Sequence, residues 1–395
     1  MEDVLVVGQT PPPVHGQSIM LKGLLDGKYD GIRLNHVRMR FSRTVDEAGK
    51  FQLRKLLLLF ITWAQIVVGR FESRSRILYF PPAGPTLIPV IRDIVLLLGT
   101  RWMFRYTVFH FHAAGLTEIY PRLPRILKPF YNLAYRNPDL AIFTAKSRTP
   151  IGVELAAKAI AVVPYGIQDF AGSQIFDRSP RPSTDPCILF MGILCEGKGL
   201  MILIEACSLL HKAGVAFRVV CGGTWGAGTS HAEVAALIES HGLTDTFSFP
   251  GVLSGEGKWK VFKEADVFCF PSHYFAESSP VVLIEAMSFQ LPIVTTNWRG
   301  IPDVVGESGG AFIVDPRRPD LVAQRLEQLL GDRTLREAMG KKNREWFCEH
   351  GTIESYRRNV EMAILEMKTG HNATLEMTTK SQARSCRVES PPGAE

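Results

Sequence analysis

Two carboxylates, Glu277 and Glu285, lie with seven residues between them in the segment FPSHYFAESSPVVLIEA at positions 270–286. The apolar run ADVFCF that leads into this segment predicts a buried strand, because it is rich in β-favouring residues and Pro271 bounds it. Positions 281–289 predict a helix. We therefore expect both acids at one strand–loop–helix junction, with Glu277 in the loop and Glu285 inside the helix.

The start of this helix has the sequence of a capped N-terminus. Ser278 or Ser279 can act as the N-cap, and Pro280 suits the first turn, where its missing N–H group would have no partner. The other N–H groups of the first turn carry partial positive charge, which favours an anion or a ring of hydroxyls at this place. The same residues also fit an ordinary junction with solvated acids, so further residues must decide.

A lysine bracketed by glycines stands at a second junction of this kind. The run CILFMG predicts a strand, and Lys198 and Gly199 come just before a predicted amphipathic helix, LMILIEACSLL. Downstream, LPIVTTN and GIPDVV repeat the strand–turn–helix pattern, and Glu285 opens an E-A-M run. This ensemble resembles the retaining glycosyltransferases of family 4, or glycosyl transferases group 1, which have the GT-B fold.

The resemblance spans residues 1–367 and implies a role for each of these side chains. In the family, glutamates spaced as Glu277 and Glu285 flank the donor sugar and the nucleotide ribose, and a lysine–glycine pair like Lys198-Gly199 meets the diphosphate. The implied reaction transfers a sugar from a nucleoside-diphosphate sugar to an acceptor glycan, with retention of configuration and no covalent enzyme intermediate. The family usually has an arginine where this chain has Ile193, so Lys198 is expected to carry more of the diphosphate charge.

A histidine pair ends another predicted strand. In YTVFHFH, His110 and His112 lie on the same face of an extended chain. Catalytic groups of open α/β sheets gather at the carboxyl ends of strands, and similar enzymes carry a histidine here near the transferring sugar. His112 is therefore the predicted catalytic histidine. A metal-binding pair and a packed structural histidine are the other interpretations.

Three further positions are expected at the donor site because of the resemblance. Gly16 follows the loop QTPPPVH and would approach the donor phosphate or the acceptor, and Gly223, after the run AFRVVCG, would lie beside the nucleotide, since glycine allows close backbone approach. Val252, in TFSFPGVLS, would lie near the base. The predicted catalytic residues are His112, Glu277 and Lys198, and the predicted donor-binding residues are Glu285, Gly16, Lys198, Gly199, Gly223, Ser278, Ser279 and Val252.

No metal and no other cofactor is expected. The chain contains no D-x-D carboxylate pair that could hold a cation, which agrees with the resemblance. Positive charge for the departing diphosphate would come instead from Lys198, from Arg299 and from the helix N-termini after Ser279 and near Gly300.

The predicted fold is α/β, with two Rossmann-like βαβ domains facing an interdomain cleft, because strands and helices alternate along the chain. The predicted parts are an acceptor-binding domain at 1–167, a linker rich in Pro, Ser and Asp at 168–186, a nucleotide-sugar-binding domain at 187–351, a helix at 352–368 returning to the first domain, and a disordered tail at 369–395.

Composition restricts the class of protein. With 46% hydrophobic and 21% charged residues, the 395-residue chain is typical of a globular protein with two cores. Its seven cysteines include no C-x-x-C pair and are expected to be small buried hydrophobes. No basic n-region precedes the first strand, so we expect no signal peptide and a cytoplasmic location. The longest apolar run, 56–68, is shorter than the roughly 20 residues of a membrane span and is expected to be buried or interfacial.

The positive charge is concentrated in the first part of the chain. Residues 1–160 contain 22 Lys or Arg and 11 Asp or Glu, whereas the remainder contains 23 and 28. This suits an anionic membrane or pyrophosphate, and no recognition helix or RNA-binding aromatic motif points to nucleic acid. Residues 120–136 interleave basic residues with apolar ones, so Leu127, Phe130 and Tyr131 are expected to enter a membrane surface. A helix packed on its own sheet, with a solvated basic side, is the other interpretation.

The sequence therefore predicts a hexosyltransferase-type enzyme that extends a lipid-linked glycan for a surface polysaccharide, as a peripheral protein on the inner face of the membrane. Two alternatives come from other classes. A nucleotide-sugar epimerase of related fold would release a free sugar nucleotide without an acceptor. A non-catalytic homologue would only bind the nucleotide sugar, and Ile193 in place of arginine keeps that interpretation open.

Overall fold

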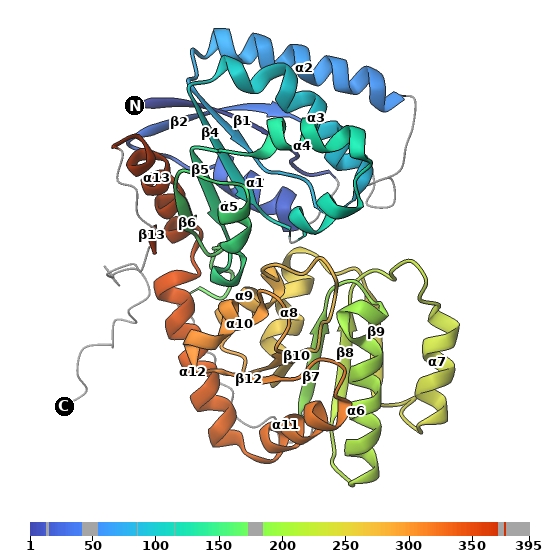
Figure 1. The fold of residues 1–395 in the computed structure, drawn as a ribbon. Coiled ribbons are helices and arrows are strands. Elements are labelled where there is room, and N and C mark those ends of the chain that lie inside the picture. Colours follow the sequence, from blue (N-terminus) through green and yellow to red (C-terminus); the bar gives the residue numbers. More distant parts are fainter. Residues whose placement is uncertain are drawn as a thin grey trace, which may run out of the picture. The chain divides into compact units, whose positions relative to one another are not determined.

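The computed structural model describes residues 1–12, 16–41, 54–84, 86–113, 115–172, 185–369 and 375–376. These residues form two compact units, which are described separately. Unit 1 comprises Met1–Ile167 together with Ile353–Thr378, and unit 2 comprises Gln168–Thr352 (Figure 1). Most of the predicted linker and of the predicted disordered tail, at 173–184, 370–374 and 377–395, lies outside the described residues.

Unit 1 is built on a seven-stranded sheet in which neighbouring strands are parallel, in the order β13-β6-β5-β4-β3-β1-β2. The strands are β1 (Glu2–Gly8), β2 (Ile32–Arg38), β3 (Ile77–Phe80), β4 (Tyr106–Phe111), β5 (Leu140–Phe143), β6 (Ile160–Val162) and β13 (Leu375–Glu376). Strands β3 and β5 are buried along their whole length. Their continuous apolar sequences follow from this burial, because helices cover both faces of a parallel sheet.

The helices of unit 1 connect these strands. They are α1 (Gly16–Leu25), α2 (Arg54–Glu72), α3 (Leu87–Thr100), α4 (Lys128–Tyr135), α5 (Pro150–Glu154) and α13 (Ile353–Thr369), with the 3₁₀ turns η1 (Arg101–Met103), η2 (Thr117–Arg122), η3 (Arg125–Leu127) and η4 (Lys146–Arg148). Helices α2, α3 and α4 lie side by side in one layer over the sheet (Figure 1).

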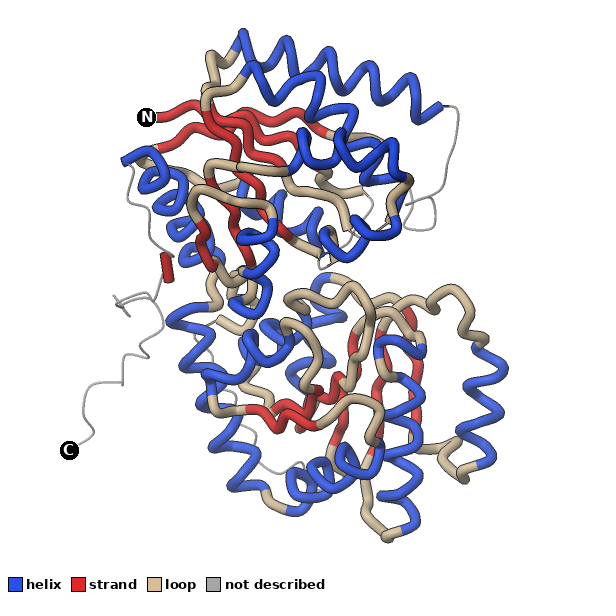
Figure 2. Tube along the Cα trace, viewed as in Figure 1, coloured by secondary structure: helices blue, strands red, loops and turns tan. Residues whose placement is uncertain are grey.

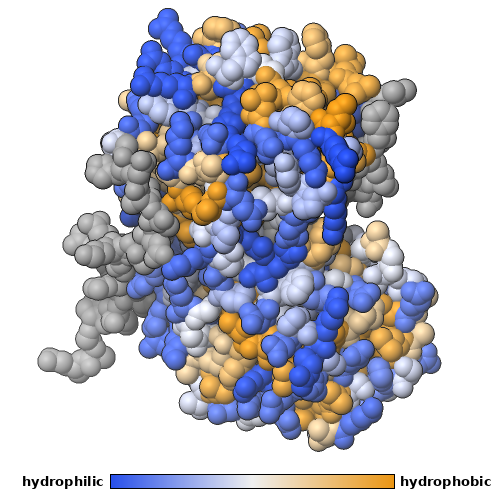
Figure 3. All heavy atoms as spheres, viewed as in Figure 1, coloured by the Kyte–Doolittle hydropathy of each residue, from blue (hydrophilic) through white to orange (hydrophobic). Residues whose placement is uncertain are grey.

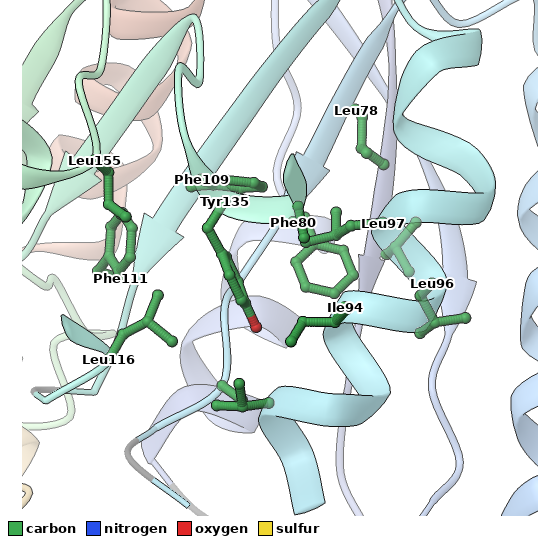
Figure 4. Close-up of a cluster of buried hydrophobic side chains, with 14 of the residues drawn as sticks. Leu78, Phe80, Ile94, Leu96, Leu97, Phe109, Phe111, Leu116, Tyr135 and Leu155 are labelled. Atoms are coloured by element: carbon green, nitrogen blue, oxygen red, sulfur yellow. The ribbon is translucent and has the colours of Figure 1, made fainter. Parts of the chain in front are cut away.

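Aromatic rings fill the core between this layer and the sheet (Figure 4). The Phe109 ring meets the rings of Phe80 and Tyr135 edge-on, with centroids 6.4 and 6.1 Å apart. Buried Asp93 of α3 accepts hydrogen bonds from the Ala83 N–H group at 2.7 Å and from the Tyr135 hydroxyl at 3.3 Å. The carboxylate thereby ties the loop after β3 to α3 and α4.

Helix α13 belongs to unit 1 although it follows unit 2 in the chain. Glu361 Oε1 accepts a hydrogen bond from the Gly31 N–H group at 2.6 Å, and Arg357 Nε donates to the Gly23 carbonyl at 2.9 Å. Lys368 forms an ion pair with Glu2. These contacts fasten α13 to α1 and to the edge where β1 and β2 begin.

Unit 2 is built on a six-stranded parallel sheet in the order β12-β11-β10-β7-β8-β9. Figure 2 shows its strands in red. Its strands are β7 (Cys187–Met191), β8 (Arg218–Gly222), β9 (Phe247–Gly251), β10 (Val267–Phe270), β11 (Ile293–Thr296) and β12 (Ala311–Val314). Its helices are α6 (Leu200–Lys212), α7 (His231–Ser240), α8 (Gly255–Glu264), α9 (Val281–Ser288), α10 (Ile301–Val305), α11 (Pro319–Gly331) and α12 (Arg333–His350), with the turns η5 (Glu196–Lys198) and η6 (Gly306–Ser308). The predicted α/β class is confirmed in both units.

Two strands were not expected from the sequence. The first, β12, pairs with β11, and its four residues AFIV give a signal too short to separate from a loop. The second, β13, lies within the tail predicted to be disordered, and it pairs in parallel with Ala161 and Val162 of β6. Thr369, also assigned to that tail, is the last residue of α13. The prediction of disorder was therefore wrong at Thr369, Leu375 and Glu376. At the last two positions the reason is that an open sheet edge pairs through backbone groups and needs no apolar side chains.

In the basic segment 120–136, Tyr131 does not have the exposed position that the sequence predicted. Tyr131 is only 2% exposed, and its hydroxyl donates to the Leu116 carbonyl at 3.2 Å, so it cannot enter a membrane. Its position on the inner side of α4 follows from helical periodicity, which places neighbouring Phe130 outward. Leu127 is half-buried.

The cysteines of unit 2 match the expectation of small buried hydrophobes in four cases. Cys187, Cys207, Cys221 and Cys269 are fully buried or nearly so. Burial raises the pKa of the Cys207 thiol well above its ordinary value, which keeps it protonated and unreactive.

Candidate active site

Lys198 and Glu277 form a buried ion pair. Lys198 ends η5, after β7, and Glu277 lies in the loop between β10 and α9. Lys198 Nζ lies 2.7 Å from Glu277 Oε2, and the Ser272 hydroxyl donates to the same oxygen at 2.8 Å. The two charged side chains keep 15% and 7% of their surface exposed. One of the three N–H donors of the ammonium group is used by Glu277, so the group can also meet an anion.

Two aromatic rings fix the direction of the lysine. Its Nζ atom lies 4.7 Å from the ring centroid of Tyr274 and 5.6 Å from that of Phe270. These distances are within the range of cation–π attraction. Trp298 Nε1 in turn donates to the Tyr274 carbonyl at 2.8 Å. The ammonium group is therefore pre-positioned by ring faces as well as by a carboxylate.

Gly199 allows the backbone turn that places this lysine. Its φ of +87° lies in the left-handed region, and a Cβ atom there would lie 2.2 Å from the Pro271 carbonyl oxygen. No side chain fits at that distance. The close approach packs the turn after β7 against the loop after β10, which carries Glu277.

Replacing Gly199 with alanine is therefore expected to lower the free energy of unfolding by more than about 1 kcal/mol, because backbone strain and a clash act together. Gly214 is the matched control: its φ is +74°, but a Cβ atom there would meet nothing within 4 Å. Chemical denaturation of both variants separates the two effects. Equal losses of stability would show that the Pro271 contact contributes nothing.

Glu285 lies on α9 and forms a second buried ion pair, with Lys258 of α8. Lys258 Nζ lies 2.5 Å from Glu285 Oε1. The other carboxylate oxygen, Oε2, is buried and has no hydrogen-bond partner among the described residues. Burial raises the pKa of Glu285, and the Lys258 ammonium group opposes that rise. A buried oxygen of this kind can accept a hydrogen bond from a ligand hydroxyl.

The start of α9 differs from the predicted serine cap. Pro280 itself occupies the N-cap position with an extended backbone (φ −65°, ψ 113°), and no side chain caps the helix. Ser278 and Ser279 are buried in the preceding loop, and the Ser279 hydroxyl has no hydrogen-bond partner within the described residues. The first-turn N–H groups of α9 are therefore left without a side-chain cap.

The loops after four neighbouring strands meet along one edge of the unit 2 sheet, because β10, β7, β8 and β9 are adjacent and parallel. Glu277 follows β10 and Lys198 follows β7. Gly223 follows β8 with φ +148°, and a Cβ atom there would lie 1.7 Å from the Gly192 carbonyl oxygen, so only glycine fits. Val252 follows β9 and is 74% exposed.

In unit 1, the two histidines at the end of β4 stack on each other with ring centroids 4.2 Å apart. His110 Nδ1 shares a hydrogen bond with the Tyr79 hydroxyl, and His112 Nδ1 shares one with the Tyr165 hydroxyl at 2.5 Å. Burial, together with His112, holds the pKa of His110 well below its ordinary value, so His110 is neutral. His110 is thus a packed core residue, whereas His112 lies just beyond the strand end.

Gly16, also in unit 1, is the first residue of α1. It is exposed, and a Cβ atom there would meet nothing within 4 Å. No packing contact with the described residues therefore requires glycine at this position.

Comparison with known proteins places this geometry in a family. The model of the family described as glycosyl transferases group 1 matches residues 173–346, most of unit 2. A Salmonella typhimurium protein named as the colanic acid biosynthesis glycosyltransferase WcaL is 34% identical over 299 residues, which cover 73% of this chain and 68% of the relative. The chain belongs to the glycosyl transferases group 1. The Escherichia coli K12 protein of the same name is 36% identical over 66% of this chain and 62% of its own length, so the chain spans less than two thirds of that relative.

Solved structures share the architecture of this group 1 glycosyltransferase. Anabaena Alr3699/HepE in complex with UDP superposes with a TM-score of 0.70 over 93% of this chain and all of that one, at 15% identity. Sucrose-phosphate synthase from Thermosynechococcus elongatus gives a TM-score of 0.66 over 93% of this chain and 99% of that one, at 16% identity. The fold is therefore GT-B, as the sequence predicted.

The predicted site residues of this group 1 glycosyltransferase fall into two groups. Those in unit 2 are Lys198, Gly199, Gly223, Val252, Glu277, Ser278, Ser279 and Glu285, and those in unit 1 are Gly16 and His112. Sequence reasoning missed Lys258 and Ser272, which hold the two glutamates. Ser272 lies within the segment 270–286, which gave no reason to single it out. Lys258 precedes Glu285 by 27 residues on another helix.

Two properties of the described residues complete the description of the site. They include no group of three or more His, Cys, Asp or Glu side chains placed to hold a metal ion. None of the helices in the described part of the chain has the length and apolar character of a membrane span.

Proposed function

We propose that this glycosyltransferase moves a sugar from a nucleoside-diphosphate sugar to an acceptor glycan, with retention of anomeric configuration. The observation that carries the proposal is made at the edge of the unit 2 sheet where neighbouring strands end. The segments that follow these strands carry a buried lysine, Lys198, and two buried carboxylates, Glu277 and Glu285. A diphosphate requires a cation and N–H donors, whereas sugar and ribose hydroxyls require acceptors. The HepE structures hold UDP or UDP-glucose, which supports this class of donor.

In this proposal, Lys198 and the first-turn N–H groups of α9 stabilise the leaving diphosphate. The bond between the anomeric carbon and the diphosphate oxygen breaks, the acceptor hydroxyl oxygen forms a new bond to that carbon, and the hydroxyl proton passes to the departing diphosphate oxygen. Negative charge grows on the diphosphate as it leaves, so positive charge held in place beforehand lowers the barrier. Retention follows if the acceptor approaches on the face from which the diphosphate departs, without a covalent enzyme intermediate.

The two glutamates have different proposed partners. Glu285 accepts hydrogen bonds from ribose hydroxyls through its unpartnered Oε2 atom. Glu277 directs Lys198 and accepts a hydrogen bond from a hydroxyl of the donor sugar. His112, oriented by the Tyr165 hydroxyl, polarises the sugar near the reacting carbon.

We further propose that the reaction needs no metal ion and that the acceptor is a lipid-linked glycan of a surface polysaccharide. Lys198 and the helix N–H groups supply the charge that a divalent cation supplies in other transferases. The WcaL relatives are named for colanic acid biosynthesis, which supports a polysaccharide product. The protein would then act at the inner face of the membrane that carries the acceptor.

An assay of the purified full chain tests these proposals together. We expect nucleoside diphosphate and one member of a nucleotide-sugar panel to raise the melting temperature, and sugar transfer to a polyprenyl-linked glycan to continue in EDTA. NMR of the product reports the anomeric configuration. Conversion of the donor to a second nucleotide sugar without acceptor would favour an epimerase. Donor binding without product for any acceptor would favour a non-catalytic homologue, and activity lost in EDTA and restored by Mg²⁺ would contradict metal independence.

A further inference from the structure

Helix α2 of unit 1 turns an apolar face outward. Leu57, Phe60 and Phe71 keep 62%, 65% and 66% of their surface exposed. With 3.6 residues per turn they lie on the same side of the helix, whereas buried Thr62 and Ile66 point the opposite way. The exposed apolar residues of α2 are Leu56, Leu57, Phe60, Ile61, Val68 and Phe71. The solvent side of a surface helix is ordinarily polar, so this side is suited to a partner.

The apolar surface continues onto the neighbouring helix. Ile91 and Val95 of α3 are exposed at a spacing of four residues, and Trp102, in the turn after α3, is 77% exposed. Trp63 Nε1 of α2 donates to the Gly99 carbonyl of α3 at 3.3 Å, which holds the two helices side by side. Figure 3 shows hydrophobic residues gathered over the upper part of unit 1, where Figure 1 places α2 and α3. We call this surface the α2–α3 face; it consists of Leu56, Leu57, Phe60, Ile61, Val68, Phe71, Leu87, Ile91, Val95 and Trp102.

The part of the chain that carries this face is basic. Between positions 54 and 136 the sequence has twelve Lys or Arg and three Asp or Glu, a formal charge of +9. Arg54 and Lys55 begin α2, and Arg122 and Arg125 are exposed in the turns before α4. An apolar face in a basic part of the chain matches a surface that offers both hydrocarbon and negative charge.

We propose that the α2–α3 face binds the surface of an anionic lipid bilayer, with α2 lying in the plane of the membrane. Its apolar side chains enter the boundary between head groups and acyl chains, and the surrounding arginines and lysines contact lipid phosphates. The 19 residues of α2 form a helix about 28 Å long that rests on the bilayer without crossing it. The inference rests on the proposed function only for its purpose, which is to bring the enzyme to a lipid-linked acceptor.

Charge favours a bilayer over a second copy of the chain. Two copies meeting through this face would bring together two surfaces of the same charge, which oppose association, whereas anionic lipids present the opposite charge.

Segment 120–136 extends the α2–α3 face and does not form it. Arg101 Nη1 donates to the Ala134 carbonyl at 2.8 Å, so α4 lies beside the end of α3. The segment adds exposed Ile126 of η3 and Leu133 of α4.

Vesicle co-sedimentation of the full chain tests the proposal. We expect binding to vesicles containing phosphatidylglycerol, little binding to phosphatidylcholine alone, and a decrease with salt. The triple variant Leu57→Gln, Phe60→Gln, Phe71→Gln should lower the partition coefficient at least about tenfold. Changing Arg122 and Arg125 to glutamate should lower it roughly fivefold for each positive charge removed. The matched control is Val153→Gln with Leu209→Gln, which changes exposed apolar residues outside the face and should bind as the unchanged chain does.

Each outcome bears on the proposal. Equal recovery in the supernatant with anionic and neutral vesicles at low salt, or unchanged binding of the triple variant, would overturn it. So would a dimer in lipid-free solution that the triple variant dissociates, because a second copy would then cover the face. Melting curves exclude unfolding of the variants. The assay contains no donor or acceptor, and nucleotide binding by the triple variant is measured separately, so failure of the membrane site is distinguishable from failure of the proposed glycosyl transfer.

Discussion

Replacing Lys198 with methionine is expected to lower kcat/KM by about 10²- to 10³-fold, the usual cost of removing one positioned donor from developing negative charge. The lysine is the buried cation of the β7 loop. Ile193, which is 39% exposed on the same loop, supplies no second charge. Methionine keeps an unbranched stem over the Tyr274 and Phe270 rings, so the loss reports the ammonium group rather than the packing.

The same substitution also affects stability, and the two effects must be separated. Without the ammonium group, Glu277 Oε2 keeps the Ser272 hydroxyl as its hydrogen-bond donor among the described residues, and an uncompensated buried charge costs on the order of 3 kcal/mol. The double variant Lys198→Met, Glu277→Gln removes both charges, so it should recover most of that stability. It should not recover activity, because the charge that meets the diphosphate is still missing.

Denaturant unfolding and initial-rate kinetics of the unchanged chain, the Lys198→Met variant and the double variant separate the effect on stability from the effect on activity. Recovery of both stability and activity in the double variant would mean that Lys198 serves only to neutralise Glu277. Turnover by the single variant at the rate of the unchanged chain would remove Lys198 from the mechanism.

The parts of the fold that the sequence predicts well are those in which one local pattern has one physical meaning. Runs such as ILYF and LAIF are short, continuous and apolar, and they are fully buried parallel strands. The glycine at 199 was recognised from its place between Lys198 and a helix, and its left-handed φ and the nearby Pro271 carbonyl give the physical reason for glycine there.

The residues that the sequence did not predict depend on contacts between distant segments. Lys258 reaches Glu285 across 27 residues, and Ser272 reaches Glu277 from the other end of the same loop. Nothing in the sequence near Lys258 distinguishes it from a solvated lysine of an amphipathic helix. For the outward apolar side of α2 the sequence left two interpretations open, a buried and an interfacial helix, because a run of apolar residues indicates either one until its neighbours are known.

Replacing Glu285 with glutamine is expected to weaken nucleotide binding by roughly 1 to 3 kcal/mol, because hydroxyl donors lose a charged acceptor. The pH dependence identifies the group. Burial raises the pKa of Glu285 above its ordinary value of 4.5, so the ionised form that accepts hydroxyls is lost at a higher pH than for an exposed glutamate. Nucleotide affinity should therefore fall as the pH is lowered through this raised pKa.

The stability of the fold changes with pH in the opposite sense. The folded chain holds the Glu285 proton more tightly than the unfolded chain, so the contribution of Glu285 to the free energy of unfolding decreases as pH rises from 4.5 to the raised value.

Lys258 supplies the control that makes this prediction specific. Its ammonium group favours ionised Glu285, so Lys258→Met should raise the pKa of Glu285 further and move the loss of affinity to higher pH. Calorimetric titration with the nucleoside diphosphate that raises the melting temperature, over a range of pH and on the unchanged chain and both variants, measures the shift. The Glu285→Gln chain corrects for titration of the nucleotide phosphate, because it lacks only the carboxyl group. If all three chains showed the same pH dependence, Glu285 would not be the acceptor for the nucleotide, and Lys258 would only neutralise a buried carboxylate.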